Sequence, residues 1–596
     1  MDMTSKHLWV MAIFTHRSKY ILLDWILHYK LWIMKTLNKL ALYIVSIATL
    51  FLMGACEKYL DRSPLDGPTD DNYFKNQDEL TLVVNGLYSA LAFHPTDDMP
   101  INLTLDDATD IGWDRNTSDL QAVGRGDHDS NNGYIRNIWT NSYKVIGKCN
   151  FILDNIQKLD GKMDVNLQQR YKAETQFIRA YVYQYLIDYF GGVPLVTSGL
   201  SLADANVPKT AKAEVAAFIL KELAEVAAIL PVNYGSADVG RATKGAALAI
   251  RARAALNNGL WEEAARSAKE IMDLKVYALH TDFGQLFTYD GEASKEIIFA
   301  FQYLRLQKTK THSTTRGFLS RNAQGTSNKI PSQSIVDSYL CTDGIAIDKS
   351  AKYDPKNPFV NRDPRLGYTI ALPGTTFFGF QFETHKDSVS CWNYSYNRSL
   401  PARIKNEDAI NAYASFSGYC WKKYVDIKDK DFTMESELNI IQSRYAEVLL
   451  IYAEAMIESN KVDQTVYDAI NSIRQRPSVD MPAIPSGKTQ DELREIVRKE
   501  RLYELANEGF RLVDLRRWKL ADKFMNSTLY GRIPKGLLAD APTIDADNYV
   551  NYKNVANQKD MRVIELRKFD PDKNYLWPIP NIEIVTNKNL EQNPGY

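Results

Sequence analysis

Residues 439–460, NIIQSRYAEVLLIYAEAMIESN, and residues 489–518, TQDELREIVRKERLYELANEGFRLVDLRRW, decide the fold that we expect for this chain. In the first stretch, apolar side chains recur at the spacing that places them on one face of an α-helix. This face consists of Ile441, Tyr445, Val448, Leu449, Tyr452 and Met456. Ala446, Ala453 and Ala455 are small enough to let a neighbouring helix approach closely. The pattern predicts one long helix over the whole first stretch, packed against another helix.

The second stretch carries signals for where a helix begins and where it ends. Thr489 and Glu492 have the spacing of a capping box, in which each side chain binds the other residue's backbone amide. Gly509 is the residue best able to adopt the left-handed turn that often follows a helix. We therefore predict a helix that begins after Thr489 and ends at Gly509.

Two carboxylates interrupt the apolar stripe of this second helix. Leu493, Ile496 and Val497 define the stripe, and at the angular spacing of a helix Glu500 and Glu504 project from the middle of it. One interpretation is a pair of catalytic acids, as in glycosidases. The other is a pair of buried structural carboxylates, which would need cationic partners because an unpaired buried charge is too costly to keep.

Nearby cations favour the structural interpretation. Five arginines lie within about 20 residues of Glu500 and Glu504, a separation of only a few helical turns, and could supply the cationic partners. They are Arg498, Arg501, Arg511, Arg516 and Arg517. We therefore interpret Glu500, Glu504 and Arg511 as candidates for structural ion pairs, and we predict no catalytic residue.

Length and composition describe a globular chain without a strong overall charge. The chain has 596 residues, of which 45% are hydrophobic, and a formal net charge of −1. This length can bury a large core. A charge near zero provides no general attraction for nucleic acid, so we expect no nucleic-acid partner. The 34 tyrosines and 10 tryptophans suit a core, an interface or a sugar-binding surface equally.

Metal and cofactor motifs are missing from the sequence. No two of the five cysteines form a CxxC pair, so a zinc or redox motif has no support. The string DHDSNNG at residues 127–133 is similar to a calcium-binding loop, but its glycine is one position late. Ile138 also stands where such a loop needs a bidentate glutamate. We predict neither a metal nor a cofactor.

An apolar run near the N-terminus indicates export. Lys35 and Lys39 precede sixteen uncharged residues that end at LMGAC, a sequence similar to a bacterial lipobox. We therefore predict a lipoprotein signal peptide over residues 34–55. Cleavage before Cys56 would free this residue for acylation, and its acyl chains would anchor the protein in the outer-membrane lipid without a transmembrane helix.

The segments before and after the predicted signal peptide also differ in character from the rest of the chain. Residues 1–33 carry several charges among apolar residues, and no signal peptide needs such a prefix. We interpret them as a misassigned N-terminal extension, with Met34 as the true start. Residues 56–77 are acidic and contain proline, as expected for a lipidated tether.

The remainder of the chain predicts two helical regions and an insert between them. Residues 78–288 show helical patterns, the clearest being a pair at residues 244–274 in which small side chains line the first helix and Gly259 makes the turn. Over residues 289–430 the periodicity fades into short β-like runs and loops, and long loops usually carry function. Residues 431–596 return to helices. The fold class is therefore mainly α, a tetratricopeptide-like scaffold of helix pairs with a loop-rich insert that contains a few short strands.

Several blocks of this chain resemble the SusD/RagB family. They are RYAEVLLIYAEAMIE at residues 444–458, AINSIRQRPSV at 469–479, KERLYELANEGFRLVDLRRW at 499–518 and YLWPIPNIEIVTNKNLEQNPGY at 575–596. Members of this family are surface lipoproteins of Bacteroidetes that capture nutrients for a TonB-dependent outer-membrane transporter. The resemblance spans nearly all of residues 56–596. It implies a non-catalytic glycan-binding protein on the cell surface that acts as a lid on a SusC-like barrel.

Two acidic and aromatic loops are candidates for contact with the ligand. The first, LDDATDIGWDRNTSD, contains Trp113, Asp114 and Arg115. The second, CWNYSYNRS, contains Trp392, Asn393, Tyr394, Tyr396 and Arg398. If this second loop is extended, its three aromatic rings lie on one side. Aromatic faces stack on the C–H surface of a sugar while amides and arginines bind its hydroxyls, although the same aromatics would also suit a loop core or a transporter interface.

Two other classes of function stay open at this stage. One is a peptide- or protein-binding lipoprotein of the same architecture that feeds a peptide importer. The other is a glycoside hydrolase that uses Glu500 and Glu504, or the cluster of Asp106, Asp107 and Asp110.

Overall fold

A computed structural model describes residues 25, 28–37, 74–306, 310–394, 396 and 399–596. The chain forms two units, Met1–Tyr73 and Phe74–Tyr596, and each is described by itself. In the first unit, residues 28–37 are helical, whereas Cys56 and residues 38–55 of the predicted signal peptide lie outside the described part. Among the helices that are described, none combines the length and the apolarity needed to cross a bilayer.

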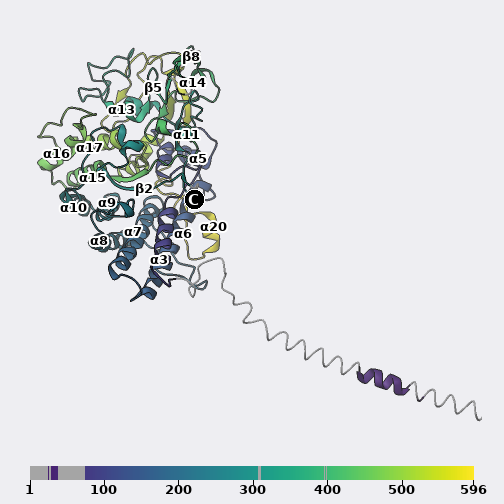
Figure 1. Ribbon diagram of the computed structural model, residues 1–596. Coiled ribbons are helices and arrows are strands. Elements are labelled where there is room, and N and C mark those ends of the chain that lie inside the picture. Colours follow the sequence, from purple (N-terminus) through teal and green to yellow (C-terminus); the bar gives the residue numbers. More distant parts are fainter. Residues whose placement is uncertain (1–24, 26–27, 38–73, 307–309, 395, 397–398) are drawn as a thin grey trace, which may run out of the picture. The chain divides into compact units, whose positions relative to one another are not determined.

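Long helices stacked one on the next form one half of the second unit (Figure 1). They are α3 (Gln77–Leu91), α6 (Gly133–Asn155), α7 (Val165–Phe190), α8 (Lys212–Ile229), α9 (Lys244–Asn257), α10 (Trp261–Leu274), α15 (Tyr445–Glu458), α16 (Gln464–Arg474) and α17 (Gln490–Leu505). From α6 to α10 each helix packs against its successor, α10 packs against α15, and α15 packs against α16 and α17. Such a series of stacked helix pairs is the tetratricopeptide-like arrangement. The predicted mainly α scaffold is confirmed.

Small side chains explain the close packing of α9 and α10. The alanines of α9 that face its neighbours are completely or almost completely buried. The turn between the two helices contains Gly259, whose φ is +71°. The helix pair predicted over residues 244–274 therefore has its expected turn and bounds.

Residues 439–460 form a strand followed by a helix, so the prediction of one long helix is wrong. The strand β10 (Ile440–Arg444) pairs antiparallel with β2 (Ile297–Phe301), and α15 begins only at Tyr445. Every residue of β10 is buried. The strand reads IIQSR, and its buried polar side chains have partners elsewhere in the fold, such as Tyr181 for Gln442 and Glu504 for Arg444. A run of five residues is too short for its periodicity to separate a strand from the first turn of a helix. Ile441 therefore belongs to the small sheet and not to the helical face.

The helix α17 begins as predicted but ends earlier. The Glu492 amide donates to the Thr489 hydroxyl, and the Thr489 amide donates to the Glu492 carboxylate at 2.8 Å, which completes the capping box. The helix ends at Leu505, before Gly509. The Gly509 amide donates to the Asp106 carboxylate at 3.3 Å and so does not extend the helical ladder.

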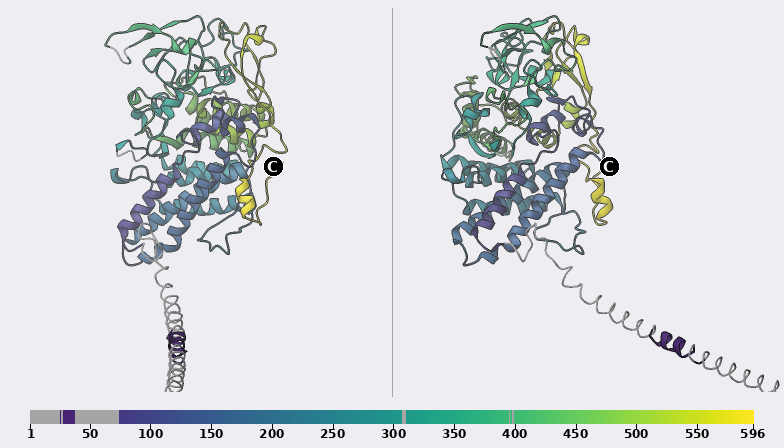
Figure 2. Two further views of the ribbon diagram at one scale, coloured as in Figure 1. Left: turned by 90° about the vertical axis from the view of Figure 1, so that its right-hand side faces the viewer. Right: turned by 45° about the vertical axis from the view of Figure 1, so that its right-hand side comes forward.

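The other half of the second unit consists of loops, short helices and small sheets (Figure 2). The short helices of this half are α4 (Asn102–Leu105), α5 (Asp119–Arg125), α11 (Thr314–Phe318), α12 (Gln333–Ser338), α13 (Pro364–Thr369), α14 (Glu407–Ile410), α18 (Arg511–Arg517) and α19 (Ala521–Met525). The last helix, α20 (Asn581–Thr586), lies with the long helices (Figure 1). The remaining strands are β1 (Gly112–Asp114), β3 (Lys329–Pro331), β4 (Ile370–Ala371), β5 (Thr376–Phe377), β6 (Phe380–Gln381), β7 (Ser390–Asn393), β8 (Ala402–Lys405), β9 (Cys420–Trp421), β11 (Thr528–Gly531), β12 (Thr543–Ile544), β13 (Val550–Asn551) and β14 (Arg562–Leu566). Strands β5, β6, β7 and β8 form a four-stranded antiparallel sheet in that order, and the other strands form pairs.

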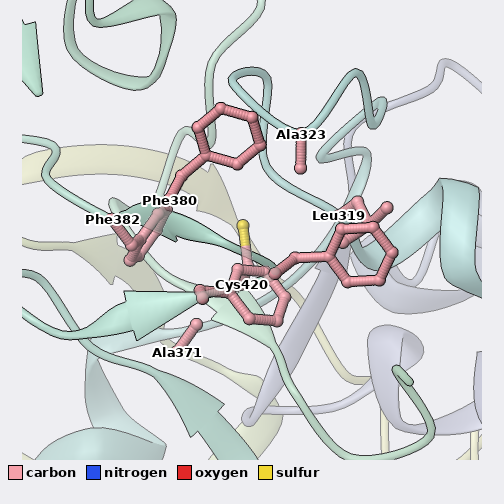
Figure 3. Close-up of a cluster of buried hydrophobic side chains, with 8 residues drawn as sticks. Leu319, Ala323, Ala371, Phe380, Phe382 and Cys420 are labelled. Atoms are coloured by element: carbon pink, nitrogen blue, oxygen red, sulfur yellow. The ribbon is translucent and has the colours of Figure 1, made fainter. Parts of the chain in front are cut away.

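The four-stranded sheet has a hydrophobic cluster of its own. Figure 3 shows side chains from this sheet and from neighbouring segments converging, among them Leu319, Ala323, Ala371, Phe380, Phe382 and Cys420. All of them are buried. Full burial of one phenylalanine contributes about 1.5–3 kcal/mol, so the cluster gives these short strands a stable base.

Candidate functional site

The loop around Trp113 lies in the interior of the second unit. β1 pairs with β3, and this pairing places Trp113 opposite Ile330. The Trp113 side chain is only 5% exposed, its indole N–H donates to Glu565 at 3.0 Å, and its ring stacks on Phe416 with centroids 5.5 Å apart. The protein itself therefore covers the face of the indole ring and binds its N–H group.

Asp114 and Arg115 also bind neighbouring parts of the chain. Asp114 is buried and accepts hydrogen bonds from the Asn116 amide and the Ser118 hydroxyl. Arg115 donates to the backbone oxygens of Thr326, at 2.9 Å, and of Tyr413. The expectation that this loop presents Trp113, Asp114 and Arg115 to a ligand does not agree with this placement, because their polar groups already have partners within the fold.

The second loop does present aromatic side chains at the surface. Trp392 lies on β7 and is 39% exposed, and Tyr394, which follows that strand, is 43% exposed. The two rings are nearly parallel, with an angle of 19° between their planes and centroids 6.5 Å apart. We call Trp392 and Tyr394, with the polar side chains beside them, the Trp392 platform.

Two polar side chains from the neighbouring strands complete this platform. Arg403 on β8 pairs with Trp392 in the sheet, and its guanidinium carbon lies 5.5 Å from the centre of the indole ring. The side-chain oxygen of Gln381 on β6 accepts from the Trp392 amide at 3.2 Å and from Arg403 at 3.3 Å. Aromatic surface and hydrogen-bonding groups thus lie within one short sheet, the combination that suits a ring with an apolar face and polar edges.

The other predicted residues of this loop have different positions. Asn393 is buried, and its side-chain oxygen accepts from the Tyr396 amide at 2.9 Å. Tyr396 turns towards the hydrophobic cluster, where its ring packs against Phe378 and Phe380. The prediction that all three aromatic rings share one side therefore fails at Tyr396, since β7 ends at Asn393 and the chain turns after it. Arg398 lies outside the described residues.

Sequence reasoning missed Gln381 and Arg403. Neither belongs to the aromatic loop, and each joins the platform only through strand pairing. Gln381 lies in FFGFQFET at residues 377–384, one of the short β-like runs of the insert. The strand register that places Arg403 opposite Trp392 joins separate segments of the chain, so no local pattern reveals it. The signal that could have identified Gln381 and Arg403 is the presence of polar side chains on the β-like runs that flank the aromatic loop.

The carboxylate of Glu504 lies in a buried network of ion pairs. Its Oε1 is 2.7 Å from both Arg444 Nη1 and Arg476 Nη2, and its Oε2 is 3.2 Å from Arg365 Nη1. All four side chains are at most 1% exposed. Burial by itself would raise the pKa of Glu504, but Arg476, Arg444 and Arg365 outweigh it and lower the pKa to about 2.

Glu500 has partners in the same network. Its Oε2 is 3.0 Å from Arg365, and its Oε1 pairs with Arg474. These arginines are not the ones that we expected. The five arginines close to Glu500 in sequence project towards other groups, and Arg511 binds Asp110 at 2.8 Å. The partners instead come from β10, from α13, from the last residue of α16 and from the turn that follows α16, which the fold brings to this face of α17.

This environment does not suit a catalytic acid. A glycosidase acid needs a raised pKa and access to its substrate. Glu504 has a lowered pKa, and both carboxylates are buried and bound by arginines. The geometry therefore favours the structural interpretation of this pair.

The cluster of Asp106, Asp107 and Asp110 also holds backbone and side chains together. Asp106 accepts from the amides of Gly509 and Arg511 at 3.3 and 3.2 Å. Burial raises its pKa to about 7, and burial likewise raises the pKa of Asp107. Both carboxylate oxygens of Asp110 accept from the Arg511 guanidinium, at 2.9 and 2.8 Å. The cluster ties the turn after α17 to the loop that precedes β1.

Side chains of the calcium-like string at residues 127–133 bind other parts of the protein. Asp127 pairs with Arg125 at 2.8 Å, and Asn132 caps α6 by accepting from the Ile135 amide. No group of three or more histidine, cysteine, aspartate or glutamate side chains is arranged to hold a metal ion within the described residues. The four cysteines within the described part of the chain are buried free thiols: Cys149, Cys341, Cys391 and Cys420.

Comparisons with known proteins agree on one family. A family model described as the SusD family matches residues 295–596, and another, described as starch-binding and associating with the outer membrane, matches residues 58–256. SusD-like protein P2 of Formosa agariphila is 25% identical over 581 residues, which cover 93% of this chain and 99% of that protein.

Solved structures give the same result. A SusD-like carbohydrate-binding protein from Bacteroides fragilis is 30% identical, with a TM-score of 0.74 and coverage of 86% of this chain and 99% of that chain. A laminarin-binding SusD-like protein is 19% identical and shares the fold, with a TM-score of 0.64 and coverage of 88% of this chain and 100% of that chain. Together with the stacked helix pairs and the loop-rich insert, these matches define the class: the chain belongs to the SusD/RagB family.

Proposed function

We propose that this chain is a cell-surface lipoprotein that binds glycans and delivers them to a SusC-like TonB-dependent transporter in the outer membrane. The proposal combines membership of the SusD/RagB family with the carbohydrate-binding descriptions of several relatives. Acylated Cys56 would anchor the chain in the outer membrane, facing the cell surface. The protein would capture its ligand without chemical change.

The observation that carries this proposal is the pair of exposed, nearly parallel rings of Trp392 and Tyr394. A sugar ring has C–H faces that pack on an aromatic surface and hydroxyls that exchange hydrogen bonds with polar side chains. Arg403 and Gln381 lie beside the rings and supply such groups. Contact through a few rings gives modest affinity, from about micromolar to millimolar, or roughly 4–8 kcal/mol.

A glycan-array screen followed by titration calorimetry tests this proposal. The protein is the chain from Glu57 onwards, which contains the whole unit Phe74–Tyr596. Trp392→Ala should weaken binding of the selected glycan at least tenfold, which is about 1.4 kcal/mol. Tyr413→Ala is the matched control, because Tyr413 is 62% exposed and its ring lies against Arg115 and Arg321, which are not part of the platform.

Each outcome of this screen has a distinct meaning. Glycan binding that is lost in Trp392→Ala and kept in Tyr413→Ala supports both the function and the site. Binding that survives Trp392→Ala keeps the function and rejects the platform. If no glycan binds at millimolar concentration but an extracellular peptide does, the peptide-capturing alternative replaces the proposal. Delivery to a SusC-like partner is tested separately, by co-purification of the lipoprotein with a TonB-dependent barrel from native membranes.

A further inference from the structure

Three arginines gather around two aromatic rings in the loop-rich half of the second unit. Arg115 follows β1, Arg321 follows α11 and Arg562 begins β14, whereas the rings of Tyr413 and Phe416 lie between α14 and β9. The guanidinium carbon of Arg115 is 5.7 Å from the centre of the Tyr413 ring and 5.9 Å from that of Phe416. Arg321 lies 5.8 Å from the Tyr413 centre, and Arg562 lies 3.9 Å from the Phe416 centre. We call these three arginines the Arg562 cluster.

The guanidinium of Arg562 has no polar partner within the described part of the chain. Burial lowers the pKa of Arg562, and neither a nearby carboxylate nor a hydrogen bond opposes this effect. The side chain stacks on Phe416 through its face, which leaves its N–H groups, a planar fork of donors, without acceptors. A partly buried cation in this condition is unfavourable, because it has lost water and gained no counter-charge.

The other two arginines donate only to uncharged backbone oxygens. Arg115 donates to the oxygens of Thr326, at 2.9 Å, and of Tyr413, and Arg321 donates to the Gly325 oxygen at 2.7 Å. Burial, and next the positive charge of Arg321, lower the pKa of Arg115. The two guanidiniums therefore repel each other, and no carboxylate among the described residues lies at ion-pair distance from either.

The surroundings add positive charge to the cluster. After burial, the charge of Arg562 is the cause that lowers the pKa of Lys386. Carboxylates on the adjoining segments already have lysine partners: Glu407 with Lys405 at 2.8 Å, Asp387 with Lys535 at 2.8 Å and Asp114 with Lys329 at 3.3 Å. An excess of positive charge remains, and a bound anion would offset it.

The cluster is open to solvent, so an anion can reach it. The three arginines and Phe416 are half-buried, and Tyr413 is 62% exposed. Partial burial strengthens the attraction between opposite charges relative to that in bulk water. The arginine fork binds two oxygens of one anionic group at once, as in arginine–phosphate pairs. The oxygens of a tetrahedral group also point in several directions and can face cations that approach from different sides.

We propose that the Arg562 cluster is an anion-binding site that takes a sulfate or phosphate group. Arg562 donates to two oxygens of this group, and Arg115 and Arg321 stabilise it mainly through their charge. The proposal goes beyond glycan binding, since it rests only on the charges and the exposure of these side chains. The group is either a free inorganic ion or an ester on a larger molecule, and both sources present the same tetrahedral oxyanion.

Titration calorimetry with sodium sulfate and sodium phosphate tests the site on the chain from Glu57. Sodium chloride keeps the ionic strength constant, so that general screening does not change during the titration. Arg562→Gln should weaken binding at least tenfold, and Arg562→Lys, which keeps the charge without the fork, should weaken it less. Arg136→Gln is the matched control, because it removes the same charge from an exposed arginine on α6, outside the cluster, and it should leave binding unchanged.

Arg321→Gln keeps the test decisive if Arg562→Gln does not fold. Arg321 is half-buried and contributes charge to the site, so this variant should weaken binding severalfold. Methyl sulfate and methyl phosphate separate the two sources of the group. A site for a free ion prefers the inorganic anions, whereas a site for an ester binds the methyl esters at least as tightly and with the same sensitivity to Arg562→Gln.

Three results would overturn the proposal. They are an absence of binding of all four anions at millimolar concentration, equal binding by the wild type and Arg562→Gln, and an equal loss in Arg136→Gln, which would show that only the net charge matters. The proposed function can fail or hold independently of these results. An uncharged glycan on the Trp392 platform needs none of the three arginines, and the anions of this test carry no sugar.

Discussion

Replacing Glu504 by glutamine should destabilise the protein strongly, because three buried arginines share its charge. Arg444 and Arg476 each lie 2.7 Å from its carboxylate, and Arg365 lies at 3.2 Å. Removing one partner of a buried ion pair leaves uncompensated charge and costs about 3–5 kcal/mol. The pKa gives a similar magnitude, since lowering it from 4.5 to about 2 corresponds to ~3 kcal/mol at about 1.4 kcal/mol per pH unit. We expect Glu504→Gln to lower the free energy of unfolding by about 3–4 kcal/mol at pH 7.

The same network predicts how the stability of the folded protein changes with pH. The pKa of Glu504 is lower in the folded protein than in the unfolded chain. Its contribution to stability is therefore fully present above pH 4.5 and is lost as the pH falls towards 2. The difference in stability between the wild type and Glu504→Gln should shrink over this window.

Urea denaturation followed by tryptophan fluorescence measures both effects on the chain from Glu57. Glu262→Gln is the control, since it makes the same chemical change at an exposed ion pair with Lys461. This control should leave the unfolding midpoint unchanged. A loss below about 1 kcal/mol for Glu504→Gln would refute the reasoning, because the network would then contribute no more than a surface pair. A loss that is the same at pH 7 and pH 3 would refute the electrostatic cause.

Three further substitutions test other parts of the fold by urea denaturation. Gly126→Ala should cost at least about 2 kcal/mol, since the residue has φ of +78° and a Cβ would lie 2.0 Å from the Lys568 carbonyl oxygen; an unchanged midpoint would contradict this packing. Thr489→Ala should cost about 1 kcal/mol through loss of the capping box, and Thr489→Ser should restore it. The raised pKa of Asp106, about 7 against 3.8, means that its contribution to stability is present below pH 3.8 and declines as the pH rises through 7. Asp106→Asn should make the free energy of unfolding less dependent on pH between pH 5 and 8. If the variant shows the same pH dependence as the wild type, Asp106 does not cause the decline.

The helical scaffold could be predicted because its signals are local. The pair α9 and α10 lies within the predicted residues 244–274, and the capping box at Thr489 begins α17 as expected. The prediction failed at β10, where a short buried run precedes a helix. The pairing partner of this strand, β2, lies in a different region of the sequence, so no local pattern could separate the strand from the helix.

The candidate site could be predicted only in part, because residue types do not reveal exposure. Trp113 and Trp392 both lie in loops of mixed aromatic and polar residues. Trp113 is buried by Phe416 and by Glu565, which is 452 residues away along the chain. Trp392 is 39% exposed and has Arg403 as its neighbour across the sheet, whereas the neighbour of Trp113 is Ile330. Long-range pairing, which a single sequence does not contain, distinguishes the two.

The separation between the buried ion pairs and the exposed platform suggests where ligand preference can change. Arg365, Arg444 and Arg476 bind α17 to the insert and to the neighbouring helices, so substitutions there should affect stability before they affect binding. The four-stranded sheet rests on a separate hydrophobic cluster, and the rings of Trp392 and Tyr394 project from it into solvent. Exposed side chains of this kind can be replaced with little effect on folding. We therefore expect relatives of the same fold to differ in ligand mainly through side chains at the position of this platform, and exchange of those side chains between relatives to transfer glycan preference without a change in the unfolding midpoint.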